Sequence, residues 1–140
     1  MLVIPDLLYV RSLARTLRES IGFLPGCAYE KARAESRLQI QRENEQPIGF
    51  LLHGRPHPGK WLRIYQTAIQ LDARRLQNAT AMVHGLEARA RENGCPGITL
   101  ACAADLDAVH FWTSLGYTHI HTYPGGRKRN RTLIRYAKLL

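Results

Sequence analysis

This 140-residue sequence has few cysteines, no long apolar run and no basic residue near its start. Only three cysteines occur, Cys27, Cys95 and Cys102, and the absence of a CxxC pair argues against a disulfide framework or a zinc site. No apolar stretch approaches the roughly 20 residues that a membrane-spanning helix needs. The segment from Met1 to Tyr9 has no basic residue ahead of its apolar part, so it is a poor secretory signal. We therefore expect a cytoplasmic protein without a bound metal or a membrane partner.

Acidic residues are also missing from the C-terminal part, because no Asp or Glu follows Asp107. The same part of the chain contains six basic residues, which are Arg127, Lys128, Arg129, Arg131, Arg135 and Lys138. With a net charge of +9 and a pI of about 10.0, the chain should attract phosphate groups on a coenzyme, a nucleotide or a nucleic acid. A solvated basic surface would have the same composition, so charge alone does not choose between these interpretations.

The length predicts one domain over residues 1–140, and an apolar content of 45% is sufficient for a core. The hydrophobic pattern changes between helical and strand periods along the chain. We expect helices over 5–20, 28–37, 76–90 and 105–115, and strands over 38–41, 47–53, 61–71, 98–103, 117–123 and 132–139. This order of helices, meander, helix, strand, helix and hairpin predicts an α/β (α+β) domain with a mixed sheet.

The most informative segment is the strand-to-helix turn from Ile69 to Ala79. The first N–H groups of a helix have no partner within the helix, and they carry a partial positive charge. A pyrophosphate fits at such an end, and Arg74 and Arg75 would add to the attraction. The pattern indicates a phosphate-binding turn, although many turns of this kind bind nothing.

This turn resembles the coenzyme motif of the GNAT superfamily of N-acetyltransferases, which is Gln/Arg-x-x-Gly-x-Gly/Ala at the start of a helix. Arg74 and Ala79 match the motif, and Gln77 departs from it where glycine is usual. Glycine lets the main chain approach a phosphate closely. A helical Gln77 can still present its N–H to the phosphate with its side chain turned aside.

A second motif of the superfamily, Asn-x-x-Ala-x-x-Phe-Tyr-x-x-x-Gly-Phe/Tyr, resembles the segment from Asp105 to Tyr117. The positions that fit in register are Ala108, Phe111, Gly116 and Tyr117. Asp105 replaces the asparagine, and Trp112 replaces the first tyrosine. Core packing explains Phe111 better than a ligand contact, whereas at Trp112 packing and a contact with the coenzyme's sulfur are equally expected. The two motifs in this order carry a resemblance that covers residues 38–140.

The resemblance implies a compact GNAT-like fold, with a mostly antiparallel central sheet that is splayed between strands 61–71 and 98–103 and flanked by helices. It also implies acetyl-CoA or another acyl-CoA as cosubstrate, with direct attack of an amine on the thioester. The residues expected at the coenzyme are Ile69, Gln70, Leu71, Arg74, Arg75, Leu76, Gln77, Asn78, Ala79, Thr80, Ala108, Phe111 and Trp112. The pantetheine arm would pair with the main chain near Ile69 and Leu71, and an N–H near Ile69 would polarise the acyl carbonyl.

A general base and a general acid are hard to find in the sequence. The superfamily often places a glutamate on the strand that corresponds to 61–71, where this chain offers Tyr65, Gln66 and Gln70. The usual thiolate-protonating tyrosine is replaced by Trp112, whose indole N–H cannot act as such a donor. The candidate catalytic residues are therefore Tyr65, Gln66 and Tyr117, and a non-catalytic module that only binds CoA stays an alternative.

Candidate acceptor contacts are His53, beside a Pro/Gly loop, and Arg127 and Arg129, between the last two strands. They indicate an acidic or phosphate-bearing amine, so an enzyme of the same fold that modifies a nucleotide or a nucleic acid is an alternative. His119 and His121 lie two residues apart on a strand and should face the same side. Because many relatives pair through sheet edges, a homodimer also stays open.

Overall fold

The computed structural model describes residues 4–16, 24–69, 73–104, 108–125 and 131–140. Its helices are α1 (Ile4–Thr16), α3 (Gly26–Ala34), α4 (Ala73–Glu92) and α5 (Ala108–Ser114). Its strands are β1 (Leu38–Glu43), β2 (Gln46–His53), β3 (Leu62–Ile69), β4 (Gly97–Ala103), β5 (Thr118–Gly125) and β6 (Arg131–Leu139). None of the helices in the described ranges is long and apolar enough to cross a membrane.

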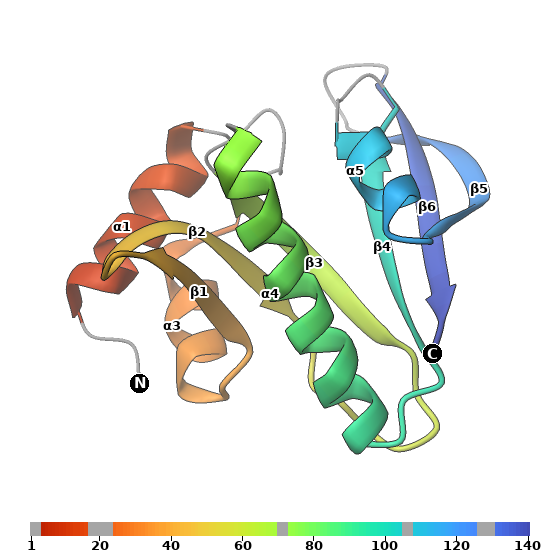
Figure 1. Cartoon of the computed structure of the whole chain (residues 1–140), viewed down its shortest axis with the longest axis horizontal. Coiled ribbons are helices and arrows are strands. Elements are labelled where there is room, and N and C mark those ends of the chain that lie inside the picture. The colour runs from red at the N-terminus through yellow and green to blue at the C-terminus, as the bar shows by residue number, and fades with distance from the viewer. Residues whose placement is uncertain (1–3, 17–23, 70–72, 105–107, 126–130) are drawn as a thin grey trace.

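The six strands form one sheet in the order β1-β2-β3-β4-β6-β5 (Figure 1). Neighbouring strands are antiparallel except β3 and β4, which are parallel. Consecutive pairing of β1, β2 and β3 confirms the predicted meander, and α4 provides the crossover that a parallel pair requires. The predicted mixed, mostly antiparallel sheet is therefore confirmed.

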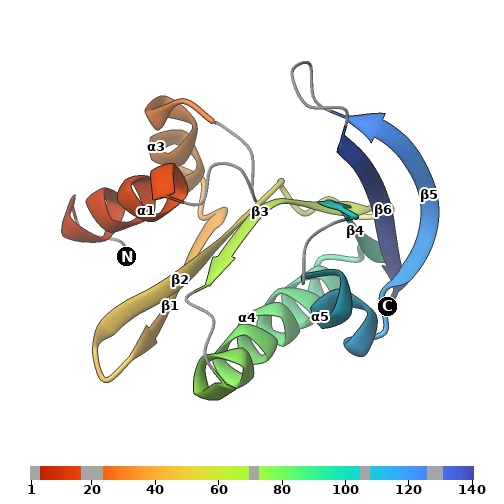
Figure 2. The same ribbon diagram turned by 90° about the horizontal axis from the view of Figure 1, so that it is seen from above.

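Helices cover both faces of the sheet, and each helix layer has its own core (Figure 2). On one face, α1 and α3 pack on the meander through buried residues such as Val10, Tyr29 and Phe50. On the other face, α4 and α5 pack on residues of β2, β3, β4 and β6. The buried residues of α4 include Ala79, Val83, Leu86 and Ala90, whose steps of three and four residues confirm the predicted amphipathic helix.

The two helix layers leave part of the sheet uncovered. α1 and α3 lie over the half that β1, β2 and β3 form, while β4, β6 and β5 lie to the side of these helices (Figure 2). No helix of the described chain covers these three strands on the side opposite α4 and α5. Within the described ranges, the side chains that point to this side from β4, β5 and β6 are not covered by a helix.

Candidate active site

The parallel strands β3 and β4 pair only at their beginnings and then separate (Figure 1). The register contains two pairs, Leu62 with Ile98 and Arg63 with Thr99, although β3 continues to Ile69. On their other sides, β3 pairs with β2 and β4 pairs with β6. The main-chain N–H and C=O groups that β3 and β4 direct toward each other beyond these pairs thus have no strand partner. The predicted splay of the sheet is confirmed, and an extended ligand with amide groups can pair with such an edge.

A β-bulge in β3 explains why the strands separate at this point. His53 pairs with Ile64 and Leu52 pairs with Gln66, so Tyr65 is an extra residue in β3. A bulge bends the strand that contains it and strengthens its twist. It begins directly after Arg63, the last residue of β3 that pairs with β4. The bulge therefore turns β3 away from β4 at the apex of the gap.

The helix α4 begins at the open end of this gap, a few residues after β3 ends (Figure 1). Its first N–H groups form the positive end of a 20-residue helix, and its first turn has no acidic residue to neutralise them. Arg74 and Arg75 belong to this first turn of the helix. The predicted contacts Gln70 and Leu71 lie outside the described residues. Ala79 packs in the core, so it can contact a ligand only through its main chain.

Thr67 adds an unpaired hydroxyl to the diverging part of β3. Its partner across the strands is Leu51, which belongs to the core under α4, so Thr67 points to the same face. Its Oγ1 is buried and has no hydrogen-bond partner among the described residues. A buried hydroxyl without a partner costs free energy unless a ligand or water satisfies it. The sequence prediction missed Thr67, because a lone threonine in a strand belongs to no motif.

The helix α5 contributes Trp112 to the core. Trp112 is 4% exposed, and its ring makes edge contacts with Phe111 and Tyr117, with ring centres 5.0 Å and 5.2 Å away. Ala108 and Phe111 are half-buried against the same cluster. Of the two expectations for Trp112, the structure favours packing.

Two predicted catalytic residues, Tyr65 and Gln66, follow one another at the bulge. Tyr65 is 50% exposed, and the Arg63 guanidinium lies 5.4 Å from the centre of its ring. Gln66 is buried, and its Oε1 accepts a 2.6 Å hydrogen bond from the Tyr29 hydroxyl. Burial raises the pKa of Tyr29, while its hydrogen bond to Gln66 acts in the opposite direction. Tyr29 thus holds the Gln66 amide in one orientation. The sequence could not predict this contact, because α3 contains no motif.

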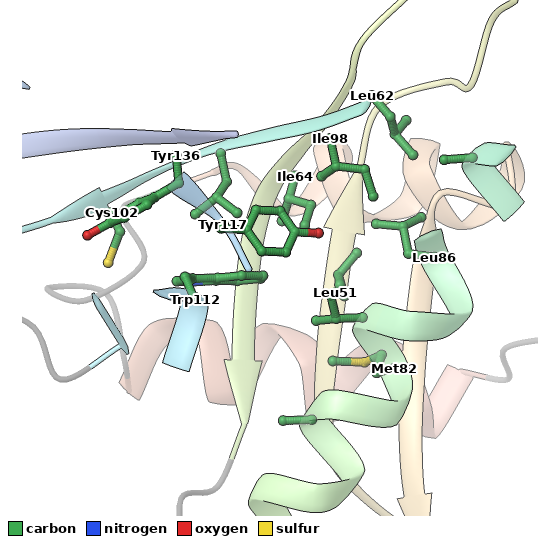
Figure 3. Close-up of a cluster of buried hydrophobic side chains, with 14 of the residues drawn as sticks. Leu51, Leu62, Ile64, Met82, Leu86, Ile98, Cys102, Trp112, Tyr117 and Tyr136 are labelled. Atoms are coloured by element: carbon green, nitrogen blue, oxygen red, sulfur yellow. The ribbon is translucent and has the colours of Figure 1, made fainter. Parts of the chain in front are cut away.

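The third predicted catalytic residue, Tyr117, lies in the core rather than in the gap (Figure 3). Its hydroxyl donates a 3.0 Å hydrogen bond to Oε2 of Glu87, a carboxylate that is 2% exposed, and Lys138 Nζ lies 3.0 Å from the same oxygen. Burial first, and the Glu87 carboxylate second, raise the pKa of Tyr117 far above its ordinary value of 10.0. These contacts favour a structural role for Tyr117, which ties the connection between α5 and β5 to α4.

His53, a predicted acceptor contact, is the last residue of β2 and is fully buried. Its Nδ1 donates a 2.6 Å hydrogen bond to the Gly54 carbonyl, and its Nε2 faces Gln39 and Arg89 of neighbouring elements. Arg89 is near the C-terminal end of α4, far along the helix from the open end of the gap. This location favours a role in the core for His53 rather than a contact with an acceptor.

The remaining predicted positions are separated from the gap or fall outside the described residues. Arg127 and Arg129 are outside them. The expectation that His119 and His121 face the same side is wrong, because an irregularity at Ile120 pairs His119 with Tyr136 and His121 with Arg135. Such a bulge reverses the face of the following residues. In the described part of the chain, no group of three or more potential metal ligands comes together.

A hollow of about 330 Å³ lies between β1 and α4. Its lining includes Gln39, Ile40, Met82, Gly85 and Arg89. Because β1 is the edge strand and β2 separates it from β3, this hollow is distinct from the gap between β3 and β4. The gap, and not the hollow, brings together the unpaired main chain and the start of α4.

Comparisons with known proteins agree with this geometry. The model of the acetyltransferase (GNAT) family matches residues 11–117. Ard1 from Thermoplasma volcanium superposes with a TM-score of 0.84 at 15% identity, over 99% of this chain and 94% of that one. The ribosomal-protein-alanine N-acetyltransferase from Brucella melitensis superposes with a TM-score of 0.77 at 14% identity, over 99% and 97%. No curated protein sequence matches the chain.

An aminoglycoside 6'-N-acetyltransferase complexed with coenzyme A superposes with a TM-score of 0.77 at 17% identity, over 98% of this chain and 92% of that one. At these identities the solved structures show the shared fold. The family model, which matches most of the chain, defines the class of the protein as an acyltransferase. The chain belongs to the GNAT family of acetyltransferases.

Proposed function

We propose that this protein transfers an acetyl group from acetyl-CoA to the amine of an acceptor by direct attack on the thioester. The observation that carries the proposal is the gap that opens between β3 and β4 at the Tyr65 bulge, with the start of α4 at its open end. Membership of the GNAT family and the likeness to an acetyltransferase complexed with coenzyme A support it. The non-catalytic CoA-binding module is the alternative that the experiments below separate from it.

The residues of the gap fit the chemistry of the cosubstrate. The pantetheine arm contains two amides, which the unpaired main chain of β3 up to Ile69 can bind as a neighbouring strand would. The buried Thr67 hydroxyl can pair with a polar group of the same arm. The first turn of α4, with Arg74 and Arg75, would hold the pyrophosphate.

In the reaction, the amine nitrogen bonds to the acyl carbon, the C–S bond breaks, the amine loses a proton and the thiolate gains one. The chain contributes position first, because an amine held at the apex needs no further orientation. Gln66 cannot accept a proton near neutral pH, so we assign it an orienting role, which Tyr29 supports through the 2.6 Å hydrogen bond. We assign the exposed Tyr65 hydroxyl, which lies beside Gly54 just after β2, to proton relay with water.

Binding of the cosubstrate is tested by thermal shift with acetyl-CoA, CoA and pantetheine. A ligand that binds the folded state stabilises it in proportion to the logarithm of its concentration over Kd. We expect stabilisation by all three, and we expect Arg74→Ala/Arg75→Ala to weaken CoA binding much more than pantetheine binding, because pantetheine lacks the pyrophosphate. No stabilisation at millimolar acetyl-CoA would refute the proposed function.

Transfer is tested by release of free thiol from acetyl-CoA in the presence of a broad panel of amines. Tyr65→Phe should lower kcat by about 10²-fold or more, the typical contribution of general acid–base catalysis, with CoA binding unchanged. Tyr29→Phe should lower kcat less, and Thr67→Val should weaken CoA binding without a separate effect on kcat. Binding of acetyl-CoA without thiol release for any amine would support the non-catalytic module instead.

A further inference from the structure

Arginine and aromatic side chains cross the uncovered side of the sheet in a continuous row. The members of this row, which we call the open-face strip, are Arg63, Tyr65, Thr99, Tyr123, His121 and Arg135. They come from β3, β4, β6 and β5 in their order across the sheet. The strip begins at the apex of the gap, because the pair of Arg63 and Thr99 is the last one before β3 and β4 separate.

The alternation of the strands places Arg63, Thr99 and Arg135 opposite α4 and α5. Leu62 and Ile64 lie in the core under α4, and so do Ile98 and Leu100. Successive residues of a strand point to opposite faces, so Arg63 and Thr99 point away from this core. Arg135 likewise lies between core-facing neighbours in β6.

Specific contacts join the members of the strip. The Arg63 guanidinium lies over the Tyr65 ring. Arg135 Nη1 donates a 3.3 Å hydrogen bond to Oγ1 of Thr99, the strand partner of Arg63. The Arg135 guanidinium also lies 6.0 Å from the centre of the Tyr123 ring. The ring of His121, the cross-strand partner of Arg135, is stacked with Tyr123 at 5.6 Å with an interplanar angle of 11°. Each guanidinium in the strip is thus held beside an aromatic face.

The charged residues of the four strands that carry the strip are all basic. None of the four strands β3, β4, β5 and β6 contains an Asp or a Glu. Arg63 and His121 are exposed, Arg135 is half-buried, and Arg131 begins β6 on the same side. Arginines on strands without acidic residues produce a field that attracts anions, and the two arginines of the strip, Arg63 and Arg135, come from two different strands.

We propose that the open-face strip binds single-stranded nucleic acid. Phosphates would pair with Arg63 and Arg135, and unpaired bases would stack on Tyr65 and Tyr123. An acidic peptide would use the arginines but not the flat rings, and a duplex would keep its bases paired and unavailable for stacking. Binding itself depends only on these residues. That a bound strand would lie beside the transfer site, and so present an acceptor amine, rests on the proposed function.

Fluorescence anisotropy with labelled RNA and DNA single strands of about 20 nucleotides tests the proposal, since sites of this kind span roughly 4–16 nucleotides. Both single strands should bind, and the binding constant should fall with salt by a slope of about 0.7 per phosphate contact. A duplex of the same length and polyglutamate serve as competitors. RNA and DNA binding equally would indicate that phosphates and bases suffice, and a preference for RNA would add the 2′-hydroxyl to the recognition.

Variants of the strip separate its two kinds of contact. Arg63→Ala/Arg135→Ala should reduce the salt slope by about 1.4. The matched control Arg91→Ala, an exposed arginine of α4 on the other face, should leave the affinity within about twofold. Tyr65→Ala should weaken binding about tenfold, whereas Tyr65→Phe, which keeps the ring, should bind as wild type does. Arg63→Ala alone removes an exposed side chain and serves if the double variant does not fold.

No binding of either single strand at low salt would overturn the proposal. Equal losses in Arg91→Ala and the strip variants, or complete competition by polyglutamate, would do so as well, because these outcomes indicate a general attraction of anions. Stabilisation by acetyl-CoA is measured on the same samples. If nucleic acid does not bind but acetyl-CoA still stabilises the protein, only this inference is refuted. If nucleic acid binds but acetyl-CoA does not stabilise the protein, only the proposed function is refuted.

Discussion

His53 should make this protein sensitive to acid, and its replacement by glutamine should remove that sensitivity. Its Nδ1 must carry the proton, because it lies 2.6 Å from the Gly54 carbonyl, which only accepts. Its Nε2 then accepts from its neighbours, Gln39 Nε2 at 3.4 Å and Arg89 Nη1 at 3.5 Å, which are both donors. A second proton would place N–H against N–H in a buried site beside the cations Arg89 and Arg37. The folded structure therefore requires a neutral His53.

The size of the effect follows from the pKa of His53. Burial lowers this pKa from its ordinary 6.5 to about 4; the Gly54 hydrogen bond opposes the shift, and Arg89 and Arg37 add to it. Between these values the unfolded chain binds a proton that the folded chain does not, so the free energy of unfolding falls as the pH falls. The full difference, at about 1.4 kcal/mol for each pH unit, corresponds to about 3 kcal/mol. This loss in the free energy of unfolding is absent above pH 6.5 and complete near pH 4.

Urea unfolding at pH 7.0 and pH 4.5 measures this loss in the wild type, His53→Gln and the matched control His84→Gln. His84 is an exposed histidine of α4, so its replacement should leave the pH dependence as it is in the wild type. His53→Gln will cost stability at pH 7.0 through its lost hydrogen bonds, but it should lose about 2–3 kcal/mol less than the wild type on acidification. Equal losses in all three proteins would show that the reasoning about His53 is wrong.

Three further substitutions test the other structural assignments, each by urea unfolding. Tyr117→Phe leaves a Glu87 oxygen without one of its donors and should destabilise by about 1–3 kcal/mol, with CoA binding unchanged; loss of kcat at full stability would restore Tyr117 as a catalytic candidate. Gly85→Ala should stabilise by up to about 1 kcal/mol, because Gly85 lies inside α4 with open space at its Cβ position. Gly97→Ala should destabilise and move Trp61, since the new Cβ would meet the Trp61 ring and the Lys138 carbonyl; an unchanged Trp61 fluorescence would contradict this.

The sequence predicted the elements and the family, because both depend on local patterns. Steps of three and four residues marked α4, alternation and β-branched residues marked the strands, and two motifs in order indicated the GNAT superfamily. The splay was implied by that resemblance alone. Its local cause, the extra residue Tyr65, was invisible, because a bulge is defined by the partner strand β2 and not by the bulged strand.

Tertiary structure decided the roles of individual side chains. His53 is beside a Pro/Gly loop in the sequence but is fully buried in the structure. Tyr117 matches a motif, but its hydroxyl donates a hydrogen bond to Glu87. The open-face strip is the clearest case. Its members are spread from Arg63 to Arg135 along the chain and become neighbours only through the strand order β3-β4-β6-β5. A sequence pattern specifies which face of its own strand a residue occupies, but pairing between distant strands specifies its neighbours, and the chemistry of a site depends on the neighbours.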